Sequence, residues 1–318
     1  MLRFLIHRVL QMIPVLFFVS VIIFVLINLV PGDAARLFLG EEASPEALAA
    51  LRHQLGLDRP LYVQYLRWVG GMLHGDFGHS FKDNRPVLPT LLEKVPATGE
   101  LTAAALVIAW TIAIPAGVFA AWRRRTTGDY VASALALLGL SVPSFWSGIM
   151  LIYLLAVHLR WLPASGLTPF AQDAVGNLRA LIMPATVLGV AQAAVVMRQL
   201  RSSMLEVLSA DFVRTANAKG LADRAVLTRH ALRNAVIPVI TVMGIQMGTL
   251  LGGAVITEAI FAIPGLGRLA VDSIYSRDYQ VLEGVVMFSA LAILMINLFV
   301  DVVYSLVDPR IHLAGGRS

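Results

Sequence analysis

The side chains that could perform chemistry are few, and their spacing does not form a catalytic set. Ser141, Ser144 and Ser147 lie within one long apolar segment, with no histidine or lysine nearby that could activate a serine as a nucleophile. His74 and His79 stand five residues apart, which is poor spacing for two ligands of one metal ion. We therefore predict neither a catalytic residue nor a metal site in this chain.

The residue pattern does not support nucleotide hydrolysis either. None of the three lysines, Lys82, Lys94 and Lys219, follows a glycine, so the chain lacks the Gly-Lys-Ser/Thr sequence of a phosphate-binding loop. Cysteine is absent, which excludes disulfides and thiolate ligands. The sequence predicts no cofactor in this chain. If ATP powers its function, partner subunits must bind the ATP and the magnesium.

The composition is typical of a polytopic membrane protein. The 318 residues are 58% hydrophobic and 14% charged, whereas soluble domains carry roughly 25% charged residues. Six apolar segments are long enough to cross about 30 Å of hydrocarbon as helices. The predicted fold is therefore all-α, with six transmembrane helices at residues 9–30, 100–121, 131–157, 181–200, 235–260 and 282–306. The first is longer than a signal-peptide core and precedes no small-residue cleavage site, so we expect it to be retained.

Lysine and arginine are distributed unevenly around these segments. With the N-terminus inside, the inner segments hold 14 basic and five acidic residues, and the outer segments hold 11 basic and 14 acidic residues. Basic residues accumulate on the cytoplasmic side of membrane proteins, so both termini are predicted to be cytoplasmic. This distribution also explains the sequence pI of about 9.8 without a nucleic-acid partner.

The largest predicted region outside the membrane, residues 31–99, lies between the first two spans. Ser44 and Pro45 are typical of a helix start, and Gly56 can end that helix. A second, aromatic-rich helix beginning near Pro60 is expected to lie on the outer membrane surface or to form a small packed cap. We expect three regions: residues 1–99 with the first span and this external segment, 100–310 as a five-helix core, and 311–318 as a cytoplasmic tail.

An inner loop, residues 201–234, contains a basic helical insert between two apolar segments. One helical run begins at Asp211 and is interrupted by Gly220, and a second extends from Asp223 to Arg233. Two short amphipathic helices cannot bury their apolar faces alone, so they need the membrane surface or a partner protein to cover them. We interpret the loop as a docking surface for a partner, with a merely interfacial helix pair as the alternative.

The loop sequence Thr215-Ala216, three residues and Gly220 resembles the EAA loop of permease subunits of binding-protein-dependent ABC importers. Arg214 stands where that motif has an acidic residue. The stretches RTANAKGL and RHALRNAVIP are similar to the dipeptide, oligopeptide and nickel branch of the family. Further similar stretches cover nearly the whole chain, including PGDAARL, GDFGHSF, LLGLSVPSFW, WLPASG, LLGGAVITEAIF, IPGLGRLAVDSI, RDYQV and LVDPRI.

The resemblance implies a B-type permease subunit in a bacterial or archaeal cytoplasmic (inner) membrane. It would pair with a second, homologous permease subunit, two cytoplasmic ATPases and an external solute-binding protein, and import solute by ATP-driven alternating access. Short peptides are the expected solute, and nickel chelates, glutathione or another small solute are alternatives. An ion-coupled secondary transporter is an alternative of a different class, although neither Asp301 nor Glu258 lies clearly at mid-membrane depth.

The resemblance also implies roles for individual residues. The expected ATPase contacts are Arg214, Thr215, Ala216, Lys219 and Gly220, with Gly220 forming the turn. Candidates for the translocation path are polar or bulky groups inside the predicted spans, although such groups also bond or pack between helices. These candidates are Ser141, Ser144, Phe145, Gln192, Gln246 and Asn297.

Overall fold

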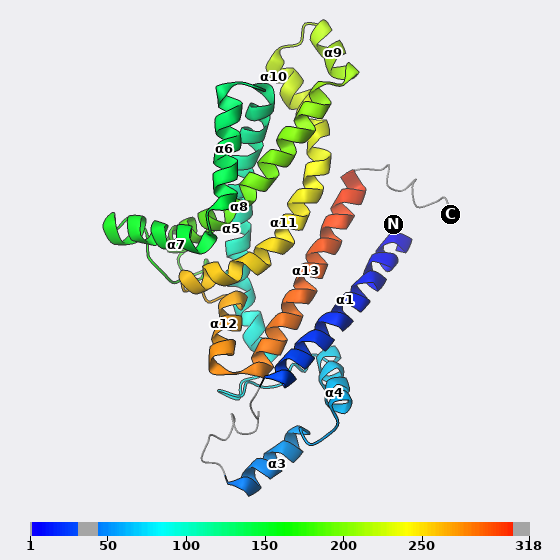
Figure 1. The fold of residues 1–318 in the computed structure, drawn as a ribbon, viewed down its shortest axis with the longest axis vertical. Helices are drawn as coiled ribbons and strands as arrows, with labels where there is room; N and C mark the ends of the chain where they lie inside the picture. Colours follow the sequence, from blue (N-terminus) through cyan, green and yellow to red (C-terminus); the bar gives the residue numbers. More distant parts are fainter. Residues whose placement is uncertain (1, 31–43, 308–318) are drawn as a thin grey trace. The chain divides into compact units, whose positions relative to one another are not determined.

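The computed structural model describes residues 2–30 and 44–307 of the chain. Over this part of the chain the regular structure is helical, apart from one isolated bridge between His79 and Pro86 (Figure 1). The predicted all-α class is therefore confirmed. The helices form two compact units, one of Met1–Pro96 with Pro264–Leu294 and one of Ala97–Ile263 with Met295–Ser318. Both units are discontinuous in sequence.

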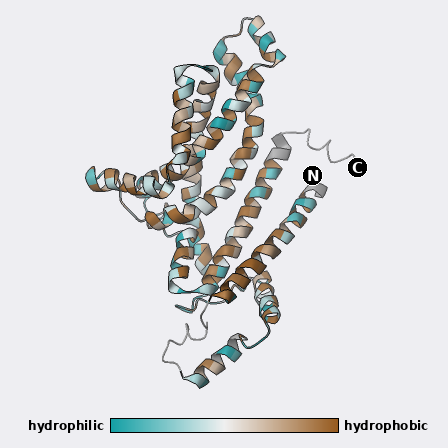
Figure 2. Cartoon of the chain, viewed as in Figure 1, coloured by the Kyte–Doolittle hydropathy of each residue, from teal (hydrophilic) through white to brown (hydrophobic). Residues whose placement is uncertain are grey.

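Most of the predicted spans correspond to long apolar helices, whose hydrophobic residues Figure 2 shows in brown. Five helices are long and apolar enough to cross a membrane, and a bent helix pair would make a sixth span. The five are Leu5–Leu29, Val87–Trp122, Ala174–Leu208, Asp223–Ile260 and Tyr279–Val303. The count of six thus agrees with the sequence when the bent pair is taken as one span.

The third span predicted at residues 131–157 is broken in the structure. α6 (Thr127–Ser141) is followed by α7 (Ser144–Leu151) and the π-helix η1 (Ile152–His158), and the two parts are bent by 96°. Between them Val142 is extended, with φ −78° and ψ 123°. Pro143 follows, and proline both disfavours helical geometry in the preceding residue and lacks an N–H to donate. The helix therefore ends at this point.

The first unit contains α1 (Leu2–Leu29), α3 (Pro45–Leu55), α4 (Leu61–Leu73), α12 (Leu266–Ser276) and the first parts of α5 (Val87–Trp122) and α13 (Tyr279–Val307). Aromatic rings join α1 to α4. The ring centroid of Phe24 lies 5.4 Å from that of Tyr65 and 5.8 Å from that of Trp68. The hydroxyl oxygens of Ser20 and Tyr65 are 2.8 Å apart. α1 therefore packs against Tyr65 and Trp68 of α4.

The terminal signals expected for α3 are present in the structure. Ser44 Oγ accepts a hydrogen bond from the Ala47 N–H at 3.2 Å, and Pro45 is the first helical residue. Gly56 ends the helix with a φ of +71°, in the left-handed region that glycine adopts without strain. The predicted start and end of this helix are thus confirmed.

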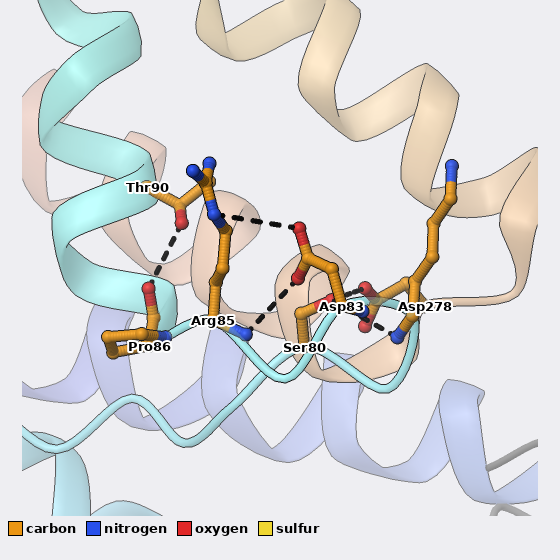
Figure 3. Close-up of polar contacts among 7 residues, drawn as sticks. Ser80, Asp83, Arg85, Pro86, Thr90 and Asp278 are labelled. Carbon is orange, nitrogen blue, oxygen red and sulfur yellow. Dashed lines mark hydrogen bonds and ion pairs between the residues drawn. The ribbon is translucent and has the colours of Figure 1, made fainter.

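Asp278, in the turn between α12 and α13, holds the segment that links α4 to α5 (Figure 3). Ser80 Oγ donates to Asp278 Oδ2 at 2.5 Å, and the Phe81 N–H donates to Oδ1 at 3.1 Å. Both Asp278 and Ser80 are buried. Within the same segment the Arg85 N–H donates to Asp83 Oδ1 at 3.2 Å. These bonds fix the segment against the start of α13 within the first unit.

α8 (Ala174–Leu208) is the central helix of the second unit and contacts α6, α7 and α11 (Leu232–Ile260). α5 also approaches α8 closely, because a Cβ built on Gly189 of α8 would lie 2.8 Å from the Ala105 carbonyl oxygen. Two apolar clusters fill the space between these helices. Their fully buried members include Leu101, Met183, Leu200, Val239 and Leu250.

One buried polar contact also joins α5 to α11. Thr98 Oγ1 donates to Glu258 Oε1 at 2.6 Å, and the Glu258 side chain has no exposed surface. A buried carboxylate is costly without hydrogen-bond donors. This bond therefore stabilises the contact between the two helices in the second unit.

Candidate functional site

The predicted docking loop between α8 and α11 forms short helical pieces. α9 (Asp211–Ala218) is followed by a turn, then α10 (Asp223–Ala225) and the π-helix η2 (Val226–Ala231). Gly220 lies in the turn with a φ of +77° and donates its N–H to the Asn217 carbonyl at 2.9 Å. Residues with a Cβ rarely adopt this conformation. The interruption predicted at Gly220 is therefore present, and the backbone geometry explains why glycine stands there.

One side of α9 faces the protein interior. Val213, Ala216 and Val226 form a buried cluster, with Val207 and Leu208 at the end of α8 packed against it. Ala216 is 6% exposed. The structure therefore places Ala216 as support beneath the loop, and its side chain has little surface left for a partner.

The opposite side of α9 is exposed and mostly polar. Arg214, Thr215, Lys219 and Gly220 are all exposed, and Thr215 Oγ1 donates to the Asp211 carbonyl at 3.0 Å. Arg214 lies 3.4 Å from the Asp211 carboxylate with a side chain that is 75% exposed. Ion pairs this exposed contribute little, so the guanidinium is available to a partner. Four of the five predicted contact residues thus share one accessible surface.

Two apolar side chains on this surface were not singled out from the sequence. Phe212 is 46% exposed and Leu221 is 41% exposed, and they flank the polar residues at either end. Aromatic residues are enriched in protein interfaces relative to the rest of the surface. The available signal was that Phe212 directly precedes Val213, because two adjacent residues of a short amphipathic helix do not point in the same direction. We define the coupling surface as Phe212, Arg214, Thr215, Lys219, Gly220 and Leu221.

An ion pair connects the C-terminal part of α8 to the first turn of α6. Arg201 Nε and Nη2 donate to the two carboxylate oxygens of Asp129 at 2.6 and 2.7 Å. The Arg125 N–H donates to Asp129 Oδ2 at 3.0 Å. The Asp129 side chain is 2% exposed. α8 leads directly into the loop that carries the coupling surface. The ion pair therefore joins α8 to the helical hairpin formed by α5 and α6.

The structure brings some of the predicted path residues together. Gln192 on α8 donates through Nε2 to Thr249 Oγ1 on α11 at 3.3 Å, and Thr249 Oγ1 lies 2.9 Å from Gln246 Oε1. Thr249 was missed, because a threonine in an apolar helix carries no distinctive sequence signal. The three residues form a polar group between two helices of the second unit.

The remaining path candidates lie elsewhere in the second unit. Ser141, Ser144 and Phe145 stand at the bend between α6 and α7, where Ser141 Oγ donates to the Leu137 carbonyl at 2.9 Å and Phe145 is 51% exposed. Asn297 is exposed on α13. Within the described ranges, 2–30 and 44–307, no group of three or more His, Cys, Asp or Glu residues could hold a metal ion.

Comparison with known proteins identifies the family. The family described as "Binding-protein-dependent transport system inner membrane component" matches residues 113–313, and the family of its N-terminal region matches residues 1–102. The chain belongs to this family. It is thus a transport permease of the inner membrane, and the resemblance read from its motifs is confirmed. It is 43% identical to the dipeptide transport system permease protein DppB of Escherichia coli K12, over 98% of this chain and 99% of that protein. DppB of Alkalihalophilus pseudofirmus is 41% identical with the same coverage.

Solved structures support the fold of this permease. The MetNI methionine ABC transporter in an inward-facing conformation matches with a TM-score of 0.57 and 20% identity, over 70% of this chain and 98% of that chain. A second crystal form of MetNI matches with a TM-score of 0.58 and 19% identity, over 69% and 96% of the two chains. The permease thus has the fold of an ABC importer membrane subunit.

Proposed function

We propose that the chain is the B-type permease subunit of an ATP-driven importer that carries short peptides into the cytoplasm. The observation that carries the proposal is the coupling surface, whose exposed cationic residues stand on a helix anchored from behind by Val213, Ala216 and Val226. A helix packed in this way moves together with the helices that it contacts. Movement of a partner bound to Arg214 and Lys219 would therefore reach α8 and α11.

The proposed function requires several partner proteins. Two cytoplasmic ATPases bind ATP and magnesium, and one of them contacts the coupling surface. A homologous second permease completes the pathway, and an external solute-binding protein delivers the solute. Both termini are cytoplasmic in this arrangement, because the coupling surface and the basic turn at Arg123, Arg124 and Arg125 then face the same side.

The choice of solute rests on the relatives. DppB of Escherichia coli, 43% identical to this permease, is a dipeptide transport system permease protein. A nickel chelate, glutathione or another small solute would use the same machine, since the external binding protein selects the solute. An ion-coupled transporter is the competing class, and it would move solute without an ATPase.

Reconstitution tests the proposal. The permease, its homologous partner, the ATPases and the binding protein are placed in liposomes, and uptake of radiolabelled dialanine is measured with and without internal ATP. We expect ATP-dependent uptake that the Arg214→Glu/Lys219→Glu double variant lowers at least tenfold, because it reverses the two exposed positive charges proposed to contact the ATPase. The matched control is Lys82→Glu, which changes an exposed lysine far from the loop in sequence. Uptake by the permease alone that a protonophore abolishes would establish the ion-coupled alternative.

A further inference from the structure

The first unit contains a cavity of about 490 Å³ with a partly polar wall. Small-molecule sites are typically about 300–1,000 Å³, and one water molecule takes up about 30 Å³ of liquid. The cavity is therefore large enough for a small solute. It is bounded by the end of α1, by the residues that follow α3, by α4, by the segment after α4 and by the start of α13.

Glu283, on α13, lines this cavity and is the most deeply buried charged residue in its wall. The residue is 7% exposed, and among the described residues no donor hydrogen-bonds to its carboxylate. By contrast Asp278, five residues earlier and also buried, accepts from Ser80 and from the Phe81 N–H. An unpaired buried carboxylate is costly. A bound cation would remove that cost.

The rest of the wall is suited to an organic cation. Trp68, Phe81 and Tyr279 supply aromatic rings, and aromatic faces attract ammonium groups. Glu283 and Asp76 give the wall two carboxylates against one cation, Arg67. Asp76 Oδ1 already accepts from the Gly78 N–H at 2.9 Å, so Glu283 is the carboxylate left without a donor. A metal ion would need more oxygen ligands than these two side chains offer.

We propose that this cavity binds the terminal ammonium group of a short peptide at Glu283. Arg67 on the same wall would meet the peptide's carboxylate, so the lining matches both ends of a zwitterion. The inference rests on the proposed function, because it takes a short peptide as the solute and assigns this permease a direct contact with it. The binding protein would then not be the only component that distinguishes peptides.

Direct binding tests the assignment separately from transport. The complex of permeases and ATPases is placed in nanodiscs without the binding protein, and dialanine and N-acetyl-dialanine are compared by saturation-transfer NMR. We expect wild type to bind dialanine at least tenfold more tightly, because only dialanine carries the ammonium. In Glu283→Gln this ratio should fall below two. Glu93→Gln, which changes an exposed glutamate outside the cavity wall, should retain it.

Competition in the wild-type complex keeps the test decisive if Glu283→Gln fails to assemble. Propylammonium chloride should displace dialanine, whereas neutral propionamide at the same concentration should not. An unchanged tenfold ratio in Glu283→Gln, or equal displacement by both competitors, overturns the assignment. ATP-dependent dialanine uptake without any binding in the nanodiscs also overturns it while the proposed function stands. Absence of ATP-dependent uptake is the separate outcome that rejects the proposed function.

Discussion

Asp129 is a buried carboxylate whose charge is balanced by Arg201. It is 2% exposed and accepts hydrogen bonds from Nε and Nη2 of Arg201, whose side chain is 28% exposed. Breaking a buried ion pair costs about 3–5 kcal/mol, because one charge is left unpaired. We expect Arg201→Met to destabilise the permease by about 3 kcal/mol, near the lower end of that range since Arg201 retains some contact with solvent.

Thermal unfolding of the purified permease measures this effect. Asp129→Asn combined with Arg201→Met should recover part of the lost stability, because the unpaired charge is then removed. Arg198→Met, on the same helix, is the control without a buried partner carboxylate and should change stability by less than about 0.5 kcal/mol. Equal losses in Arg201→Met and Arg198→Met would show that the pair contributes nothing.

At the scale of single residues, the sequence predicted local backbone geometry but not side-chain contacts between residues far apart in the chain. Gly220 could be predicted as a turn because glycine tolerates left-handed geometry, and its φ of +77° agrees. Ala216 was predicted to contact the ATPase, yet it is buried beneath the loop. The bond between Asp129 and Arg201 joins residues 72 positions apart, and helical periodicity carries no information over that distance.

A buried polar bond contributes to the contact between α5 and α11 in the second unit. Thr98 Oγ1 donates to the fully buried Glu258 at 2.6 Å. Valine has nearly the shape of threonine but no hydroxyl, so Thr98→Val removes one hydrogen-bond donor from the buried carboxylate. We expect a loss of about 1–3 kcal/mol, measured by thermal unfolding. Thr90→Val removes an exposed hydroxyl of the same helix and should have little effect.

The bend between α6 and α7 is an element whose existence the sequence indicated and whose size it did not. Pro143 disfavours a continuous helix, but proline kinks vary with the surrounding packing, so the 96° angle could not be read from the sequence. The candidates Ser141, Ser144 and Phe145 consequently lie at a corner and not along a straight helix.

Removing Pro143 should straighten this element. Spin labels attached at Leu137 and Tyr153, which are 54% and 62% exposed, report the distance between α6 and η1. The absence of native cysteine makes the labelling specific. Sixteen residues of continuous helix span about 24 Å, so we expect Pro143→Ala to lengthen the mean distance towards that value. An unchanged distance would show that contacts of α7 with α8 hold the bend without the proline.

At the scale of the whole molecule, apolar length predicted the spans well, because the bilayer sets a minimum helix length whatever the tertiary contacts are. The division into units was less predictable. Pro264–Leu294 belongs to the same unit as Met1–Pro96, although the two are far apart in sequence. Their shared buried contacts, such as Ser80 with Asp278, arise only after the chain has folded.

Orientation in the membrane is the remaining whole-molecule prediction, and the coupling role depends on it. Lys82 and Asn217 are both exposed, the first in the segment between α4 and α5 and the second on α9. In right-side-out vesicles a membrane-impermeant maleimide should label the Lys82→Cys variant, and should label Asn217→Cys only after detergent opens the membrane. The cysteine-free parent chain gives the background. Reversed labelling would place the coupling surface outside, where no cytoplasmic ATPase could reach Arg214 or Lys219, and the proposed mechanism would then be untenable whatever solute is transported.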